Sequence, residues 1–186
     1  MKLAWIKVID EQEAEGTLKD LYNEIIEKRG RVANILKVHS LNPQSMSAHM
    51  DLYLTLMYCS SPLSREEREM LAVCVSSLNN CKYCKTHHGD ALNVYWKDED
   101  KLEKFKRNWR EVIHSDRQRA MLEYAEKLTK TPHKVSEEDI ERLKKYFDDR
   151  GILDITLIVA YFNFVNRIAL GLGVEVTDEE RRGYKY

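Results

Sequence analysis

The chain has 186 residues, of which 43% are hydrophobic and 33% are charged, as is typical of a water-soluble folded protein. Its 30 basic and 31 acidic side chains give a formal net charge of −1, which argues against binding to nucleic acid or to an anionic membrane. A chain of this length can bury a core without disulfides or metals, so we expect a single domain over residues 1–186.

The N-terminal residues do not resemble a signal peptide, because Lys2 and Lys7 interrupt their apolar side chains. We therefore expect a cytoplasmic protein, in which the 4 cysteines are free thiols rather than a disulfide framework. Cys59 and Cys74 lie in apolar surroundings in the sequence and are predicted to be small core residues.

Helix signals recur along the chain, whereas hairpin signals are lacking and only 7 glycines and 3 prolines occur. Apolar residues at helical spacing over 17–29, followed by Gly30, predict a first helix that ends at that glycine. Asn42 and Pro43 combine a good N-cap with proline at the first helical position, which predicts a second helix reaching Met57.

A third helix is predicted by Ser64 and Glu67, which have the spacing of a capping box. Apolar residues at helical spacing continue from there to Leu78, where Asn79 and Asn80 can turn the chain. A helix that follows so short a turn can fold back against this one.

The rest of the chain is also predicted to be helical. The charged stretch 97–107 is expected to form a solvated helix with a few apolar contacts. Ser115 and Ser136 begin two further helices. The most apolar segment, 154–170, predicts a helix that ends at the glycines that follow it.

Three polar residues, Asn163, Asn166 and Arg167, interrupt this apolar helix and argue against a span that faces lipid. We expect a central buried helix, or one covered by a partner subunit. Because buried polar groups need partners, all three are predicted to bond between helices or between subunits, and the alternative is a direct role in a substrate pocket. Together these elements predict an all-α fold.

The stretch Cys81-Lys-Tyr-Cys84-Lys-Thr-His87-His88 places two thiols and two imidazoles close together. Cys81 is expected near the start of a helix, where unpaired backbone N–H groups stabilise a thiolate. Cys84 lies three residues on, within reach of a disulfide, and His88 lies one turn beyond Cys84 on the same face. A thiol beside a base is what an activated cysteine nucleophile needs.

The preceding helix offers a carboxylate to this site. Glu66, Glu67 and Glu69 lie in its first turns, and Glu69 is the best candidate because Glu67 is engaged in the cap and Glu69 neighbours apolar positions. A carboxylate there could orient an imidazole. The local charge pattern alone instead favours a glutamate that faces solvent.

Zinc binding is the competing interpretation of the same cluster. Cys81, Cys84 and either His88 or His87 are acceptable zinc ligands, although the sequence has no second Cys/His cluster to complete the set. His49, on the helix before the motif, is the other histidine that could join the pocket. The remaining histidines are interpreted as surface or core residues.

The pattern Glu69-x11-Cys81-x2-Cys84-x3-His88 resembles the motif of alkylhydroperoxidase D-like (AhpD-like) proteins, in the carboxymuconolactone decarboxylase superfamily. The resemblance extends over roughly residues 5–175 and is strongest to a peroxidase-related branch of that superfamily. The segments that carry it are Leu52-Tyr53-Leu54, Met57-Tyr58, Ser61-Pro62-Leu63-Ser64, Glu67-Arg68-Glu69-Met70 and Ala160-Tyr161-Phe162-Asn163-Phe164-Val165-Asn166-Arg167-Ile168.

The resemblance implies an AhpD-like helical bundle that assembles into homo-trimers or homo-hexamers and reduces hydroperoxides without haem, flavin or metal. It implies that Cys84 is oxidised to sulfenic acid and that Cys81 donates a proton and then forms the disulfide. Glu69 and His88 would be the relay that deprotonates Cys84. An external dithiol, such as a lipoyl- or thioredoxin-like protein, would then restore the thiols.

One position departs from the well-characterised type, which has a histidine where this chain has Tyr83. A phenol cannot replace an imidazole as a base near neutral pH, although its hydroxyl can pass a proton or hold a water. His87 is the candidate to compensate. The alternative functions are a non-catalytic zinc-binding or scaffold oligomer and a decarboxylase of the same superfamily, whose members generally lack the paired cysteines.

Overall fold

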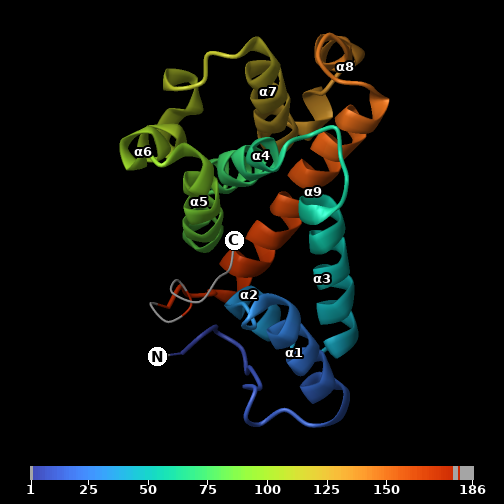
Figure 1. Ribbon diagram of the computed structural model, residues 1–186, viewed down its shortest axis with the longest axis vertical. Helices are drawn as coiled ribbons and strands as arrows, with labels where there is room; N and C mark the ends of the chain where they lie inside the picture. Colours follow the sequence, from blue (N-terminus) through green and yellow to red (C-terminus); the bar gives the residue numbers. More distant parts are fainter. Residues whose placement is uncertain (1, 178–179, 181–186) are drawn as a thin grey trace. The chain divides into compact units, whose positions relative to one another are not determined.

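A computed structural model of the protein describes residues 2–177 and residue 180, and all regular structure in this part is helical (Figure 1). The predicted all-α fold class is therefore confirmed. The elements are α1 (Gly16–Arg29), α2 (Asn34–Lys37), α3 (Pro43–Tyr58), α4 (Arg65–Leu78), α5 (Lys82–Trp96), α6 (Glu99–Asn108), the short 3₁₀ helix η1 (Trp109–Glu111), α7 (Asp116–Lys130), the 3₁₀ helix η2 (Pro132–Lys134), α8 (Glu137–Lys144) and α9 (Asp149–Leu172).

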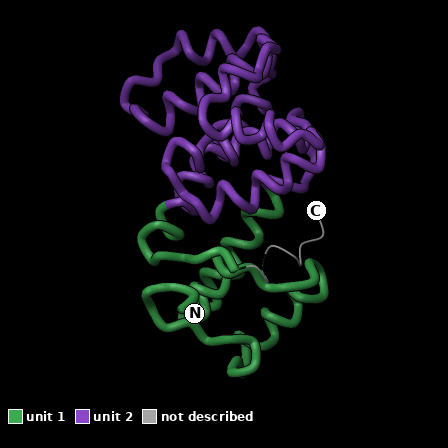
Figure 2. The backbone as a smooth tube through the Cα atoms, turned by 90° about the vertical axis from the view of Figure 1, so that its left-hand side faces the viewer, with its two compact units in different colours: residues 1–55, 167–186 green, residues 56–166 purple. Residues whose placement is uncertain are grey.

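The chain divides into two compact units, which Figure 2 shows in different colours. Unit 1 consists of residues 1–55 and 167–186, and unit 2 of residues 56–166, so the boundaries fall within α3 and α9. Unit 1 has its own apolar core, formed by α1, α2 and α3. Unit 2 holds the Cys-x-x-Cys segment and Glu69. The expectation of one domain over 1–186 stays a prediction.

Most helix ends lie where the sequence signals put them. The capping box of α4 is formed, with Ser64 Oγ accepting from the Glu67 amide at 3.1 Å and Glu67 Oε2 accepting from the Ser64 amide at 2.9 Å. Gly30 ends α1 with a φ of 84°. Ser115, by contrast, precedes α7 without a side-chain cap bond.

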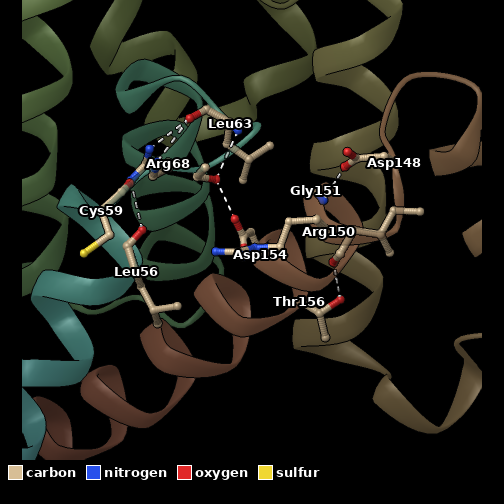
Figure 3. Close-up of polar contacts among 11 residues, drawn as sticks. Leu56, Cys59, Leu63, Arg68, Asp148, Arg150, Gly151, Asp154 and Thr156 are labelled. Atoms are coloured by element: carbon tan, nitrogen blue, oxygen red, sulfur yellow. Dashed lines mark hydrogen bonds and ion pairs between the residues drawn. The ribbon is translucent and has the colours of Figure 1, made fainter.

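The apolar helix α9 is longer than the sequence pattern predicts. It begins at Asp149 rather than at residue 154, because Asp148 Oδ1 accepts a hydrogen bond from the Gly151 amide at 2.7 Å (Figure 3). It also passes through Gly171 and ends at Leu172, and Gly173 follows with a φ of 60°. Hydrophobic periodicity alone therefore places the start of the helix too late, because the first turn is capped by a charged residue, Asp148.

Helix α4 is the centre of unit 2. It packs against α5, α6 and α7, and its side chains are buried on every face from Glu67 to Ser76. A helix enclosed in this way places any polar residue of its middle turns inside the protein. Glu69 is therefore an interior residue.

The connection from α3 to α4 is held by buried polar bonds (Figure 3). The Arg68 guanidinium donates to the backbone carbonyls of Leu56, Cys59 and Leu63, at 2.9–3.3 Å. Ser61 Oγ donates to Asp154 Oδ2 of α9 at 2.6 Å. These bonds tie the connection to α4 and to α9.

The two cysteines outside the motif differ in burial. Cys74 is buried in α4, as predicted. The prediction that Cys59 is a core residue is wrong, because its side chain is exposed. Cys59 follows the last turn of α3, and its backbone carbonyl accepts a hydrogen bond from Arg68.

Within unit 2, α9 buries one face and exposes another. Ile155, Ile158 and Phe162 are fully buried, whereas Leu157 and Phe164 are exposed. By length and composition alone the helix could cross a membrane, a property that it shares with core helices of soluble proteins. The exposed apolar residues are of the kind that a subunit interface covers. Assembly into a homo-oligomer and a cytoplasmic location stay predictions.

Candidate functional site

A tight turn brings the two cysteines against α4. Asn80 adopts a φ of 53°, a left-handed conformation that asparagine tolerates better than most residues. The Cys81 amide then donates to the Ser76 carbonyl at 2.9 Å. Cys81 is the N-cap of α5, and Cys84 lies in the first turn. The sequence-based placement of Cys81 at a helix start is confirmed.

The two thiols are free, buried and joined by a side-chain hydrogen bond. The bond from Cys84 lowers the pKa of Cys81, helped by the Cys84 backbone N–H and the charge of Lys85, and these effects outweigh burial. The same bond, together with burial, raises the pKa of Cys84 well above its usual value. Negative charge therefore forms first on Cys81, at the helix N-terminus, and the shared proton resides on Cys84.

Glu69, which is fully buried, pairs with the partly buried His88 of the thiol motif. His88 Nδ1 lies 2.7 Å from Glu69 Oε2, and the Glu69 side chain has no exposed surface. Since a carboxylate only accepts, Nδ1 carries the hydrogen of this bond. The alternative of a glutamate facing solvent is wrong. The Phe162 ring stands edge-on to the imidazole, with ring centroids 4.6 Å apart.

The charge state of Glu69 is set by its partners. Burial alone would raise its pKa, but the charge and hydrogen bond of His88, followed by those of Arg65, hold the pKa below its usual value. Arg65 donates to Glu69 Oε1 from Nε at 2.8 Å and from Nη2 at 2.6 Å. Arg65 is not among the site residues predicted from the sequence, although its position four residues before Glu69 on a helix is a spacing at which such pairs form.

Two further groups, which the sequence does not identify as thiol partners, contact Cys84. Ser76 and Asn166 both hydrogen-bond its thiol, and these bonds oppose the rise in its pKa. Asn166 Nδ2 also donates to Ser76 Oγ at 3.1 Å, and Asn166 Oδ1 accepts from Asn79 Nδ2 at 3.0 Å. The predicted bonding of Asn163 and Asn166 between helices is confirmed, because Asn163 contacts Asn79 and Thr129. Ser76 gave no signal in the sequence beyond lying on the buried helix.

Asn166→Ala is expected to make Cys84 less reactive. Removing a donor that favours the thiolate raises the pKa of Cys84 further, so alkylation of Cys84 by iodoacetamide at mildly alkaline pH should slow roughly tenfold. Mass spectrometry of the Cys84 peptide measures this rate. Asn163→Ala is the matched control, because Asn163 shares the partner Asn79 without bonding the thiol. Equal slowing in both variants would contradict the assigned role.

The three residues predicted around the site lie in different places. Tyr83 and His87 are both buried on α5, with ring centroids 4.6 Å apart. His49 belongs to unit 1, where its Nδ1 lies 3.0 Å from His39 Nε2 and burial lowers its pKa to about 4. A part for any of them in the chemistry of the thiols stays a prediction.

The zinc interpretation gains no support from the arrangement of ligands. Over residues 2–177 and residue 180, no three or more His, Cys, Asp or Glu side chains are grouped so that they could hold a metal ion. Cys81 and Cys84 are instead engaged with each other and with Ser76 and Asn166.

Comparisons with known proteins agree with this architecture. The family model of the carboxymuconolactone decarboxylase family matches residues 43–127. The structure is similar to the alkylhydroperoxidase AhpD core of an uncharacterized peroxidase-related protein from Ralstonia eutropha JMP134, with 30% identity, a TM-score of 0.86 and full coverage of both chains. It is also similar to an uncharacterized peroxidase-related protein from Silicibacter sp. TM1040, with 32% identity and a TM-score of 0.82, covering 100% of this chain and 95% of that one.

A curated relative is the uncharacterized protein YdfG of Bacillus subtilis (strain 168). It is 27% identical over 137 residues, which are 73% of this chain and 91% of that protein. The likeness thus extends over most of both proteins and includes the helices that carry the thiols.

Proposed function

Because the chain belongs to the carboxymuconolactone decarboxylase family, in its AhpD-like group, we propose that it is a thiol-dependent peroxidase that reduces hydroperoxides through Cys81 and Cys84. The observation that carries this proposal is the hydrogen bond between the two buried thiols, with the lower pKa on Cys81. Paired thiols of this kind support redox chemistry over decarboxylation, because decarboxylation needs neither of the two thiols.

In the first step the Cys84 thiolate attacks the terminal oxygen of the hydroperoxide. The O–O bond breaks, Cys84 becomes a sulfenic acid, and the alkoxide leaves as an alcohol after taking a proton. His88, oriented by Glu69, takes the thiol proton and returns it to the leaving oxygen. The donors Ser76 and Asn166 stabilise negative charge on the Cys84 sulfur.

In the second step the Cys81 thiolate attacks the Cys84 sulfenic acid. An S–S bond forms, and hydroxide leaves and is protonated to water. The lowered pKa of Cys81 supports this role, because the resolving nucleophile must be a thiolate. An external dithiol then reduces the disulfide by two exchange reactions and is itself oxidised. The net reaction converts hydroperoxide and dithiol into alcohol, water and disulfide.

Treatment of the pure, reduced protein with one equivalent of hydrogen peroxide tests this proposal. We expect two thiols to disappear and the intact mass to fall by that of two hydrogens, with Cys81 and Cys84 linked in the digest. Dithiothreitol should restore both thiols. Retention of all thiols, or a disulfide that involves other cysteines, would show that the proposed reaction is wrong.

A further inference from the structure

The carboxylate of Glu69 is divided between two partners, one on each oxygen. Oε1 accepts both hydrogen bonds from Arg65, and Oε2 accepts the bond from His88 Nδ1. The side chain has no contact with solvent. His88 thus meets a carboxylate whose charge is already balanced by a guanidinium on its far side.

Arg65 is itself held in place on its other sides. Nη1 donates to the Met57 carbonyl at 3.2 Å, and the guanidinium lies over the Tyr58 ring, 3.8 Å from its centroid. Its side chain keeps 21% of its surface exposed, so the charge is partly solvated, whereas that of Glu69 is not. The arginine can therefore carry its charge at little cost and present it to the buried carboxylate.

The net charge of Arg65, Glu69 and His88 determines which protonation state of His88 is favoured. With Arg65 present, a neutral His88 leaves the three groups with no net charge, and a protonated His88 leaves them with a charge of about +1 in a buried site. Without Arg65, the neutral imidazole would leave about −1, and protonation would bring the remaining pair to zero. The guanidinium therefore favours the neutral imidazole.

We propose that Arg65 is a positioning residue that, through Glu69, keeps His88 in the neutral form that can accept a proton. The role in peroxide reduction rests on the proposed function, but the effect on the protonation of His88 does not. Arg65 fixes the orientation of the carboxylate, and the carboxylate fixes which nitrogen of His88 carries hydrogen. The opposite nitrogen, Nε2, is then the one that takes up a proton.

Other groups near this pair come from several helices. Tyr58 of α3 lies against Arg65, and Phe162 of α9 lies against His88. From α6, Lys106 reaches the backbone of Gly89, next to His88, and is paired with Glu103 at 2.7 Å. Arg65 is the cation that bonds Glu69 from its own helix, so its removal changes the charge balance most directly.

Arg65→Met tests the proposal, because it keeps much of the side-chain length and removes the charge. We expect the Glu69–His88 pair to take up its proton at a pH about one unit higher than in the wild-type protein. An NMR titration of the His88 ring resonances measures this midpoint and needs no enzymatic activity. Arg65→Lys, which retains the charge, should return the midpoint most of the way to the wild-type value.

Arg117→Met is the matched control, because Arg117 pairs with Glu67, another buried glutamate of α4, at 2.8 Å but outside the thiol site. Its His88 midpoint should equal that of the wild-type protein. An unchanged or lower midpoint in folded Arg65→Met would overturn the proposal. If that variant does not fold, Arg65→Gln replaces it, with the same expected direction.

The acid limb of the rate of Cys84 oxidation should move to higher pH together with the NMR midpoint. A shifted midpoint without any peroxide reaction would leave the role of Arg65 standing and overturn the proposed function instead. A normal peroxide reaction with an unshifted His88 midpoint in Arg65→Met would overturn the role of Arg65 and leave the proposed function standing. The two ideas can thus fail separately.

Discussion

In the Cys84→Ser protein we expect peroxide consumption with dithiothreitol to fall by roughly three orders of magnitude or more, and no disulfide to form. A serine hydroxyl is not ionised near neutral pH and cannot accept the oxygen of a hydroperoxide, so the sulfur that is oxidised has no substitute. Stopped peroxide assays and thiol counts measure the loss. Because Cys59 is exposed and can react on its own, the comparison is best made in a Cys59→Ser background.

The companion variant Cys81→Ser separates the parts of the two sulfurs. With the resolving thiol removed, the sulfenic acid on Cys84 should persist and be captured by dimedone, which mass spectrometry locates. Peroxide consumption at the wild-type rate in Cys84→Ser would refute the mechanism. A sulfenic acid captured on Cys81 in Cys84→Ser would reverse the roles of the two cysteines. The lowered pKa of Cys81 makes this the specific alternative to test.

The local features of this site follow from the sequence, because they depend on short spacings. The capping box of α4, the turn at Asn80 and the position of Cys81 at the start of α5 all depend on residues close in the chain. Helix periodicity also places His88 one turn beyond Cys84. These predictions needed no knowledge of tertiary contacts.

The burial of Glu69 could not be predicted in this way. It lies in a run of charged residues whose sequence is typical of a solvent-exposed helix surface. Most of this run is nevertheless buried, because its charged side chains pair with groups that are distant in the sequence. Arg68 binds the carbonyls of the α3–α4 connection, and Glu67 pairs with Arg117. Local charge density says nothing about such contacts, and hydrophobic periodicity cannot distinguish an exposed charge from a paired one.

The ionisation of the thiols shows the same division. The position of Cys81 at a helix start predicts a lowered pKa, and the structure agrees in direction. The raised pKa of Cys84 depends on its bond with Cys81 and on burial, and it is opposed by Asn166, which is 82 positions away in the chain numbering and adjacent only in the fold. A sequence motif can therefore identify the reacting groups without indicating which of them holds the proton.

Glu69→Gln is expected to have the second-largest effect on the reaction, slowing Cys84 oxidation by about 10²-fold to 10³-fold at neutral pH. The amide can present either oxygen or nitrogen to His88, so it no longer fixes which imidazole nitrogen carries hydrogen, and Arg65 loses its counter-charge. Peroxide-driven disulfide formation measures the rate. Glu66→Gln is the control, because Glu66 takes no part in the thiol site: its Oε1 accepts a hydrogen bond from Trp96 Nε1 at 2.6 Å. The rate of Cys84 oxidation in this variant should match that of the wild type.

The same substitution should also change how stability depends on pH. The pKa of Glu69 is lower in the folded protein than its ordinary value, so its ionised form stabilises the fold above the unfolded pKa, about 4.3, and that contribution is lost as the pH falls through the folded pKa. At neutral pH, Glu69→Gln should therefore cost roughly 2 kcal/mol, less than a fully buried pair because Arg65 is partly exposed. Urea unfolding at neutral and acidic pH should show this difference shrinking below about pH 4. A difference that stays constant down to strongly acidic pH would mean that the pKa of Glu69 is the same in the folded and unfolded protein, so that His88 and Arg65 do not stabilise its anion.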